Sequence, residues 1–377
     1  MKKNRFLFLL IILVLLAMGL LACKKEGPPV ESFSSAPPSV VSETPSESPT
    51  EEIPTDISWT TGRKDTTTIY KPVIVQIDNE PPARPQEGLQ LADIVYETLI
   101  EGSDTRLTCI FNDVLYTAGA AEKITVGPVR SSRYYHQYIQ SEWDGLYVHM
   151  GGPDSTHNSE SAIWGANGAH IKQRINGAGK YAVNSNMFYK NKNGDPVSHF
   201  AMTDLVADAA IYDYEPEPLQ QFKFYPLEAY AEEKEIEGVQ LSFLRTVGFV
   251  EYRYDKETDL LTRYMNDKPF TTDETGEAVT VQNLIVQYTV VEGMPGDDPL
   301  KRVNMFGEGR ADFFIHGKHL TGRWERADIK TPTKYYLDSG EEVTLAPGNT
   351  WVAVHPLSKE VLVTYADGTE DTINPAS

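Results

Sequence analysis

Short apolar runs that end in polar residues characterise the first half of the chain. The run Pro72–Ile77 stops at Asp78-Asn79 and a proline-rich stretch, which predicts a buried strand followed by a loop. Ile94–Glu101 alternates between two faces, and Gly102-Ser103-Asp104 separates it from a second run at Arg106–Phe111. These two runs and the turn between them predict a β-hairpin.

A helix is predicted in the middle of this half, with Ser131 or Ser132 as a suitable N-cap. Large apolar and aromatic residues recur there at helical spacing, at Tyr134, Tyr135, Tyr138 and Ile139. Short strands are also predicted at Ile124–Val126 and Leu146–Met150. Because strands and helices are mixed, residues 58–220 are expected to form an α/β (mixed α+β) N-terminal domain.

From about Leu241 the pattern changes to a period of two. Short β-rich runs, separated by turn residues, occur at Gly248–Tyr254, Leu261–Tyr264, Asn283–Val290, Ala311–His316, His319–Glu325, Thr333–Leu337 and Thr350–His355. This spacing predicts a second, β-rich antiparallel C-terminal domain at residues 240–372, built as a sheet or a partly closed barrel. The acidic stretch Glu215–Gly238 is expected to join two separable folding units.

The first 23 residues indicate in which cellular compartment the protein is located. A basic start precedes the apolar run Phe6–Ala17, and Leu20-Leu21-Ala22-Cys23 resembles a bacterial lipobox. That resemblance implies a signal peptide at residues 1–22 and acyl chains on Cys23, which would hold the protein on the extracytoplasmic face of the cell membrane. The alternative is an uncleaved membrane helix, although roughly 17 apolar residues is the shortest span for one.

Residues 23–57 are expected to form a disordered tether. Prolines occur there among Ser, Thr and Glu, without helical or strand periodicity. Proline-rich segments stay extended at ~3 Å per residue, so the tether could hold the folded part up to roughly 100 Å from the membrane.

The net charge of the chain argues against nucleic acid and anionic membrane surfaces as binding partners. Asp and Glu total 54 against 34 Lys and Arg, which gives a formal net charge of -20. Such an acidic chain is a poor candidate for binding the phosphate backbone of nucleic acid, and an anionic membrane surface repels it. We therefore expect no nucleic-acid partner, and membrane contact only through the anchor.

Sequence signals for cofactors and metals are weak. Gly177-Ala178-Gly179-Lys180 lacks both the first Gly and the Ser/Thr of a phosphate-binding loop. Cys23 and Cys109 are the two cysteines, which excludes a disulfide framework and argues against structural zinc. Cys109 alternates with Leu107 and Phe111 on an apolar face, so it is expected to be buried rather than a nucleophile. We predict no cofactor and no metal.

Several long blocks resemble the YerB-like bacterial lipoproteins, a two-domain family of unknown function. The blocks are PVIVQIDNEPPARPQEGLQLADIVYE (Pro72–Glu97), GPVRSSRYY (Gly127–Tyr135), DGLYVHMGGP (Asp144–Pro153) and FGEGRADFFIHGKHLTGRWER (Phe306–Arg326). The chain departs from the family at Ser198-His199-Phe200, where Pro-His-Asn is expected. The resemblance implies a secreted, anchored two-domain protein and brings no established reaction.

Polar residues gather at the predicted strand ends, where α/β sheets commonly bind ligands. The candidate ligand-binding residues are Asp78, Asn79, Glu97, Glu101, Arg106, Arg130, Ser131, Arg133, His149, Gly151 and Gly152. Arg130 and Arg133 flank a helix start, which suggests an anion pocket lined by Tyr134 and Tyr135. The alternative is that both arginines pair internally with Glu97, Glu101 or Asp78.

Two functions fit these features. The first is a non-catalytic binding or scaffold protein of the cell envelope that contacts an anionic ligand, a wall polymer or an envelope protein. The alternative is an envelope hydrolase or transferase that uses two carboxylates on a glycan or peptide. Glu97 and Glu101 would lie ~13 Å apart along one strand, so Asp78 with Glu97 is the more plausible pair. The lack of a recognised catalytic motif favours the binding function.

Overall fold

The structure is a computed structural model that describes residues 54–118, 122–154, 160–179, 182, 185–191, 199–220, 222–243, 249–272, 276–295 and 299–376. The predicted signal peptide, the lipidation site Cys23 and all but the last residues of the predicted tether lie outside the described residues. Within the part of the chain that the structure describes, no helix is both long enough and apolar enough to cross a membrane.

Strands from both halves of the chain form one sheet, which has 13 strands among the described residues. The first half supplies β1 (Val73–Asp78), β2 (Ile94–Leu99), β3 (Thr105–Phe111), β4 (Val126–Val129), β5 (Leu146–His149), β6 (Arg174–Asn176), β7 (Phe188–Asn191) and β8 (His199–Met202). The second half supplies β14 (Asn283–Thr289), β17 (Gly307–Ile315), β18 (Lys318–Arg326), β19 (Lys334–Leu337) and β20 (Thr350–Pro356).

A second sheet, with seven described strands, comes from the second half alone. Its strands are β9 (Ile236–Leu241), β10 (Val250–Asp255), β11 (Leu260–Met265), β12 (Lys268–Pro269), β13 (Thr280–Val281), β21 (Val361–Tyr365) and β22 (Glu370–Ile373). A separate hairpin consists of β15 (Val291–Gly293) and β16 (Lys301–Val303). The described helices are α2 (Asp113–Thr117), α3 (Tyr134–Trp143) and α4 (Leu205–Ala210), with short 3-10 turns η1 (Pro81–Ala83), η2 (Leu89–Leu91), η3 (Glu101–Ser103) and η4 (Ser185–Met187).

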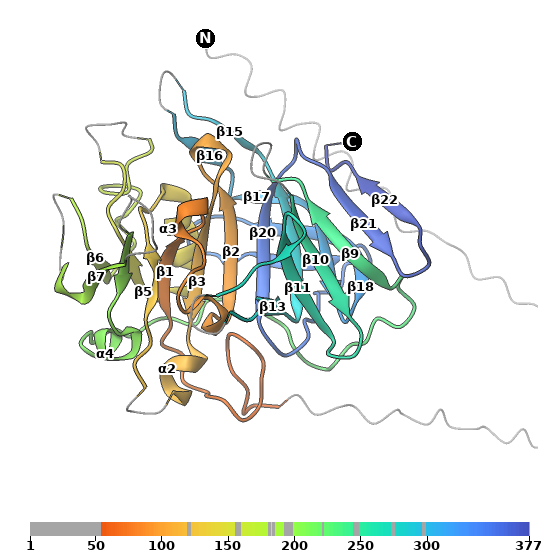
Figure 1. Ribbon diagram of the computed structural model, residues 1–377, viewed down its shortest axis with the longest axis horizontal. Coiled ribbons are helices and arrows are strands. Elements are labelled where there is room, and N and C mark those ends of the chain that lie inside the picture. Colours follow the sequence, from red (N-terminus) through yellow and green to blue (C-terminus); the bar gives the residue numbers. More distant parts are fainter. Residues whose placement is uncertain are drawn as a thin grey trace, which may run out of the picture. The chain divides into compact units, whose positions relative to one another are not determined.

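The strand β20 joins the two halves. It pairs in parallel with β2, from Ile94 opposite Thr350 to Thr98 opposite Val354, and in parallel with β14 on its other side. Figure 1 shows β20 beside β2. All seven residues of β20 are buried, as expected for a central strand covered on both faces.

The expectation of two separable folding units is therefore wrong. The large sheet contains strands from before and after residue 230, and the described residues belong to one compact unit. The stretch Glu215–Gly238 is no open linker, since Phe222 and Phe224 within it are buried in the core. The expectation that the second half is purely antiparallel is also wrong, because β14 and β20 run parallel.

Most predicted elements are present. The strands expected from the alternating runs of the second half appear as β10, β11, β14, β17, β18, β19 and β20, and the predicted hairpin is β2–β3. The chain is strand-dominated, so its fold is mostly β. Cys109 is free and fully buried, as predicted, and burial raises the pKa of its thiol.

Helix α3 forms where the spacing predicts it, but its N-cap is Arg133 rather than Ser131 or Ser132. The Ser132 hydroxyl lies 2.6 Å from the Tyr147 hydroxyl of β5, so it is committed to the sheet instead of the helix end. The Arg133 backbone N–H donates to Nδ1 of His136, at 3.0 Å, which closes the first turn.

Alternate residues of the large sheet enter two apolar clusters, as the period of a strand requires. Val73, Val75 and Ile77 of β1 pack in one cluster with residues of the second sheet such as Val239 and Tyr252. Residues on the other face, including Ile74 and Val352, pack with Tyr135, Ile139 and Trp143 of α3. These two layers fix the strand ends at which the candidate site lies.

Candidate functional site

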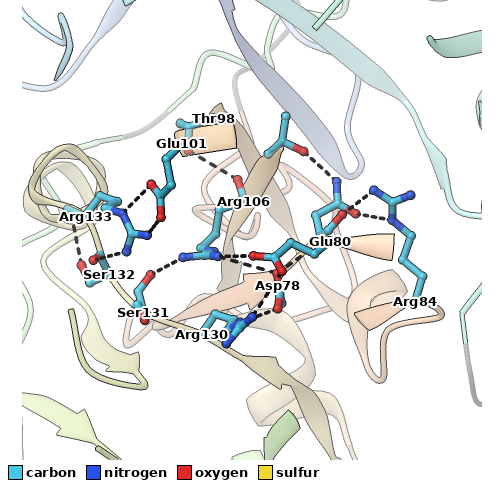
Figure 2. A network of polar contacts seen from close by, with 12 residues as sticks. Asp78, Glu80, Arg84, Thr98, Glu101, Arg106, Arg130, Ser131, Ser132 and Arg133 are labelled. Atoms are coloured by element: carbon cyan, nitrogen blue, oxygen red, sulfur yellow. Dashed lines mark hydrogen bonds and ion pairs between the residues drawn. The ribbon is translucent and has the colours of Figure 1, made fainter. Parts of the chain in front are cut away.

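Part of the predicted polar set converges at one end of the large sheet, where Figure 2 shows Asp78, Glu101, Arg106, Arg130, Ser131 and Arg133. Asp78 ends β1 and lies opposite Arg106 of β3. Arg130 follows directly after β4, and its backbone carbonyl accepts a hydrogen bond from the Met150 N–H just beyond β5. Strands far apart in the sequence therefore bring these side chains together.

Asp78 is the centre of the network. Its carboxylate is fully buried and lies 2.5 Å from Nε of Arg130 and 3.7 Å from Nη2 of Arg106. Glu80 adds a second carboxylate, 3.3 Å from Arg130 and 3.4 Å from Arg106. Arg106 also donates to the Ser131 carbonyl at 2.9 Å. Burial, together with the charge of Arg133, lowers the pKa of Arg106.

Arg133 makes a separate pair with Glu101. Its Nη2 and Nε both donate to the Glu101 carboxylate, the latter at 3.1 Å. Burial opposes ionisation of Glu101, but the hydrogen bonds and charge of Arg133 outweigh burial and lower the Glu101 pKa. Glu101 belongs to η3 rather than to β2, which ends at Leu99, so it does not share a strand face with Glu97 as expected.

Both arginines of the predicted anion pocket are thus bound to internal carboxylates. Arg130 is 34% exposed and Arg133 is 9% exposed. Tyr135, expected to line the pocket, is fully buried in the core. The geometry matches the alternative of internal pairing, and an incoming anion would have to compete with Asp78, Glu80 and Glu101 for the same donors.

Glu97 points away from these arginines and forms a second network. Its carboxylate accepts hydrogen bonds from Thr105 at 2.7 Å, Asn79 at 3.3 Å and the Trp351 indole at 3.1 Å. It also pairs with Arg263 of β11 at 3.1 Å, and both side chains are fully buried. The Arg263 guanidinium lies over the rings of Phe270 and Trp351, at 4.2 and 4.9 Å. This ion pair links β2 to the second sheet.

The geometry does not favour Asp78 and Glu97 as an acid–base pair. Both carboxylates are fully buried, and each is bound to an arginine. A glycosidase requires two carboxyl groups that reach a substrate across an open cleft. Neither side chain reaches solvent in this structure.

His149, Gly151 and Gly152 form a packed turn beside the network. His149 is fully buried, and Nδ1 donates to the Gly151 carbonyl at 2.8 Å. Burial lowers the His149 pKa to about 3, so the ring is neutral. A Cβ on Gly152, where φ is 155°, would lie 2.4 Å from Cδ1 of Ile163 and 2.8 Å from the Ser132 carbonyl oxygen. Gly152 therefore serves close packing, whereas Gly151 adopts a positive φ of 71° that favours glycine.

An aromatic cleft that the sequence reasoning missed lies between α3 and the β15–β16 hairpin. It has a volume of about 450 Å³. The lining includes Tyr134, Tyr138, Met294, Met305, Phe306 and Val290, with Glu160, Glu292, Arg302 and Asn304 as its polar members. The tyrosines four residues apart on the predicted helix were the available signal, but their partners come from a segment about 160 residues later.

A buried ion pair holds α3, the helix that lines this cleft, against β18. Arg326 of β18 lies 2.6 Å from Glu142 of α3, and both side chains are fully buried. The Arg326 guanidinium also donates to the Tyr138 carbonyl at 2.9 Å and lies 5.1 Å from the centre of the Phe306 ring. This pair fixes α3, and with it Tyr138, against the second half of the chain.

Two further buried carboxylates lie near the start of the described chain. Asp93 accepts hydrogen bonds from the Thr60 hydroxyl at 2.6 Å and from the backbone N–H groups of Asn112 and Asp113 at 2.9 and 3.0 Å. Asp113 accepts from the hydroxyls of Ser58 and Thr61. Burial, and next the charge of Asp113, raise the Asp93 pKa to about 7.

The described residues include no cluster of three or more His, Cys, Asp or Glu side chains suited to a metal ion. His199 lies in β8, but its side chain is not among those that the structure describes. The departure from the family pattern at this position is therefore observed in the sequence only.

Comparison with known proteins gives consistent results. Residues 60–214 match the family described as "Protein of unknown function (DUF3048) N-terminal domain", and residues 239–352 match its C-terminal domain. A Bacillus subtilis (strain 168) protein named "Putative lipoprotein YerB" is 29% identical over 308 residues, covering 76% of this chain and 81% of that protein.

A solved structure agrees with this relationship. The crystal structure of the YerB protein from Bacillus subtilis superimposes with a TM-score of 0.63 at 25% sequence identity, covering 79% of this chain and 96% of that chain. Both domain matches and the homologue confirm the resemblance that the sequence blocks indicated. The chain is a homologue of YerB and belongs to the YerB-like family with N- and C-terminal DUF3048 domains.

Proposed function

We propose that the protein is a lipid-anchored, extracytoplasmic binding protein of the bacterial cell envelope, which holds a glycan strand of the cell wall without turnover. The anchor would be Cys23, from the lipobox-like sequence, and the name of the Bacillus subtilis homologue supports this part of the proposal. An extended tether would carry the folded part away from the membrane, towards the wall.

The aromatic cleft is the observation that carries the binding role. Tyr138 and Phe306 are partly exposed, and their ring centres lie 4.9 Å apart at an interplanar angle of 44°. Such rings offer apolar faces to the flat faces of sugars, while the tyrosine hydroxyl provides a polar end. A concave site with apolar walls and a few fixed polar groups is typical of ligand pockets.

The polar rim of the cleft suits hydroxyl groups rather than a strong charge. Arg302 lies 2.7 Å from Glu160 and 3.5 Å from Glu292, so its charge is balanced while part of its surface stays accessible. Asn304 is exposed at the same rim. Paired donors and acceptors of this kind can bond to sugar hydroxyls without the cost of neutralising a charge.

The absence of turnover rests on the carboxylates at the sheet end. Asp78 and Glu97, the most plausible catalytic pair from the sequence, are both buried in arginine ion pairs. Activating either of them would require breaking a buried ion pair, at a cost of ~3–5 kcal/mol. This arrangement supports a structural role for both residues.

Sedimentation with purified, insoluble cell-wall glycan tests the binding role. We expect Tyr138→Ala and Phe306→Ala each to weaken binding about tenfold, because each removes one face of the cleft. Tyr336→Ala is the matched control, since Tyr336 is a partly buried tyrosine of β19 that stacks on Arg323 outside the cleft. Equal binding by all three variants and the unaltered chain would reject the cleft as the glycan site.

A further inference from the structure

We propose that a second cleft, between the segment after β1 and the turn that joins β11 to β12, binds a phosphate-type oxyanion. Its volume is about 280 Å³, and its lining includes Arg84, Met265, Asn266, Lys268 and Phe270. It shares no lining residue with the aromatic cleft, so this site goes beyond the proposed glycan binding.

Arg84 differs from the neighbouring arginines because none of the described carboxylates forms an ion pair with it. Arg106 and Arg130 pair with Asp78 and Glu80, and Arg263 pairs with Glu97. Among the residues that the structure describes, no carboxylate lies within ion-pair distance of Arg84. Figure 2 shows Arg84 at the edge of the network, on the far side of the Asp78 centre from Arg133.

The contacts of Arg84 are made with neutral groups. Nε donates to the Asn79 side-chain oxygen at 3.2 Å, Nη2 donates to the Asn79 carbonyl, and Nη1 contacts the thioether sulfur of Met265. A guanidinium has five N–H donors, so two remain after these three contacts, one on each terminal nitrogen. A pair of donors on the two terminal nitrogens is the arrangement that binds carboxylate and phosphate oxygens.

The surroundings favour an added negative charge. The Arg84 guanidinium is half-buried and stands 5.8 Å from the centre of the Phe270 ring, which Arg263 also faces. Burial is the main cause that lowers the Arg84 pKa to about 10, the charge of Arg263 is the next, and the charges of Glu97, Asp104 and Asp78 oppose this lowering only in part. An anion beside Arg84 would relieve both effects, since it replaces lost hydration and screens the second cation.

The other lining residues point to the same ligand class. Lys268 is exposed at the cleft, and among the described lining residues none is acidic. Among the residues that the structure describes, neither Arg84 nor Lys268 has a carboxylate within ion-pair distance, which is unusual in a chain of net charge -20. An oxyanion with two charged oxygens complements Arg84 and Lys268 together, and we therefore favour phosphate over a monovalent anion.

The phosphate group could be free or part of a polymer, and two probes distinguish these sources. Inorganic phosphate and a soluble poly(glycerol phosphate) should be titrated separately into the full-length chain in detergent, by isothermal calorimetry. Binding of both probes identifies a phosphate group carried by a polymer, and binding of inorganic phosphate alone identifies a free phosphate. Failure of inorganic phosphate to bind in the millimolar range would overturn the proposal.

Three variants test whether phosphate binds at this cleft. Arg84→Gln should weaken phosphate binding at least about tenfold, and Lys268→Gln should weaken it roughly threefold, because Lys268 is exposed and its charge is better screened. Lys256→Gln is the control, since Lys256 is an exposed lysine that pairs with Glu235 away from the cleft, and it should bind normally.

Lys268→Gln keeps the test valid if Arg84→Gln does not fold, because an exposed side chain contributes little to folding. The site is not at this cleft if the Lys268→Gln variant binds phosphate as well as the Lys256→Gln control does. The same holds for Arg84→Gln, which, if it folds, must also bind phosphate less well than the control. Glycan sedimentation by Arg84→Gln should be unchanged, so failure of this proposal is separable from failure of the glycan proposal.

Discussion

Replacing Arg263 by Met should destabilise the whole described fold, because it breaks the buried ion pair between the second sheet and β2. Both Arg263 and Glu97 are fully buried, and the pair joins residues 166 positions apart. Removing one partner of a buried pair costs ~3–5 kcal/mol, since the remaining charge is left without compensation. Glu97 keeps its bonds from Thr105, Asn79 and Trp351, so the lower part of this range is expected.

Urea unfolding, followed by tryptophan fluorescence and by circular dichroism, measures this effect. The matched control is Arg253→Met on the neighbouring strand β10, where Arg253 is 40% exposed and pairs with Glu251 and Asp267. An exposed pair contributes at most ~1 kcal/mol, so the control should unfold almost as the unaltered chain does. The two probes should report one coincident transition, because β20 makes both halves part of one sheet.

A double variant separates the ion pair from the packing of Arg263. Glu97→Gln combined with Arg263→Met removes both charges, and it should be more stable than Arg263→Met alone by roughly 2 kcal/mol. An Arg263→Met variant as stable as Arg253→Met would refute the reasoning. Two separate transitions, assigned to the two halves, would refute the view that they fold together.

Three other predictions follow from the structure. Asp93 has a folded-state pKa of about 7, above its unfolded value near ~3.8. Its own contribution to the free energy of unfolding should therefore fall by roughly 3–4 kcal/mol as pH rises from about 4 to 7, and the unaltered chain should lose stability relative to Asp93→Asn by that amount. Thermal melts of the unaltered chain and of Asp93→Asn at several pH values test this prediction. An equal change of melting temperature with pH in the two proteins would contradict it. Arg133→Gln should destabilise the protein more than Arg130→Gln, because Arg133 is 9% exposed and Arg130 is 34% exposed; the reverse order in urea midpoints would exclude Arg133 as an internal strut. Cys23→Ala should release the protein from membranes or leave an unprocessed precursor, and a mature protein that begins at an unlipidated Cys23 would disprove anchoring.

The local sequence predicts the elements well, because strand and helix periods are properties of neighbouring residues. The β2–β3 hairpin and α3 follow from alternation and helical spacing within about 15 residues. The position of β20 does not follow in the same way, since its partner β2 lies more than 250 residues earlier. The uninterrupted apolar run Trp351–Val354 was nevertheless a signal in the sequence, because a run that does not alternate is typical of a strand covered on both faces, and all seven residues of β20 are indeed buried.

The membership of the candidate site was predicted only in part, and its pairing was not predicted. Glu80 joins the network although the sequence analysis did not single it out, and Glu97 lies in a separate network with Arg263. Asp78, Arg106 and Arg130 come together because each lies at a strand end of the same sheet. Which carboxylate each arginine meets depends on side-chain direction and on distant strands, and Arg263 could not be assigned to Glu97 from any local pattern. The helix N-cap was misplaced for the same reason, since Tyr147 of another strand engages the Ser132 hydroxyl.

The most direct test of the account incubates the full-length chain with purified cell-wall glycan and measures two quantities in one sample. These are the fraction of protein bound to the insoluble glycan and the amount of soluble sugar or peptide fragments released over time. The proposed function predicts saturable binding that depends on Tyr138, with no release of fragments above the background of a chain-free control. Release of fragments that grows with time and with protein concentration, or failure to bind at any concentration, would contradict it.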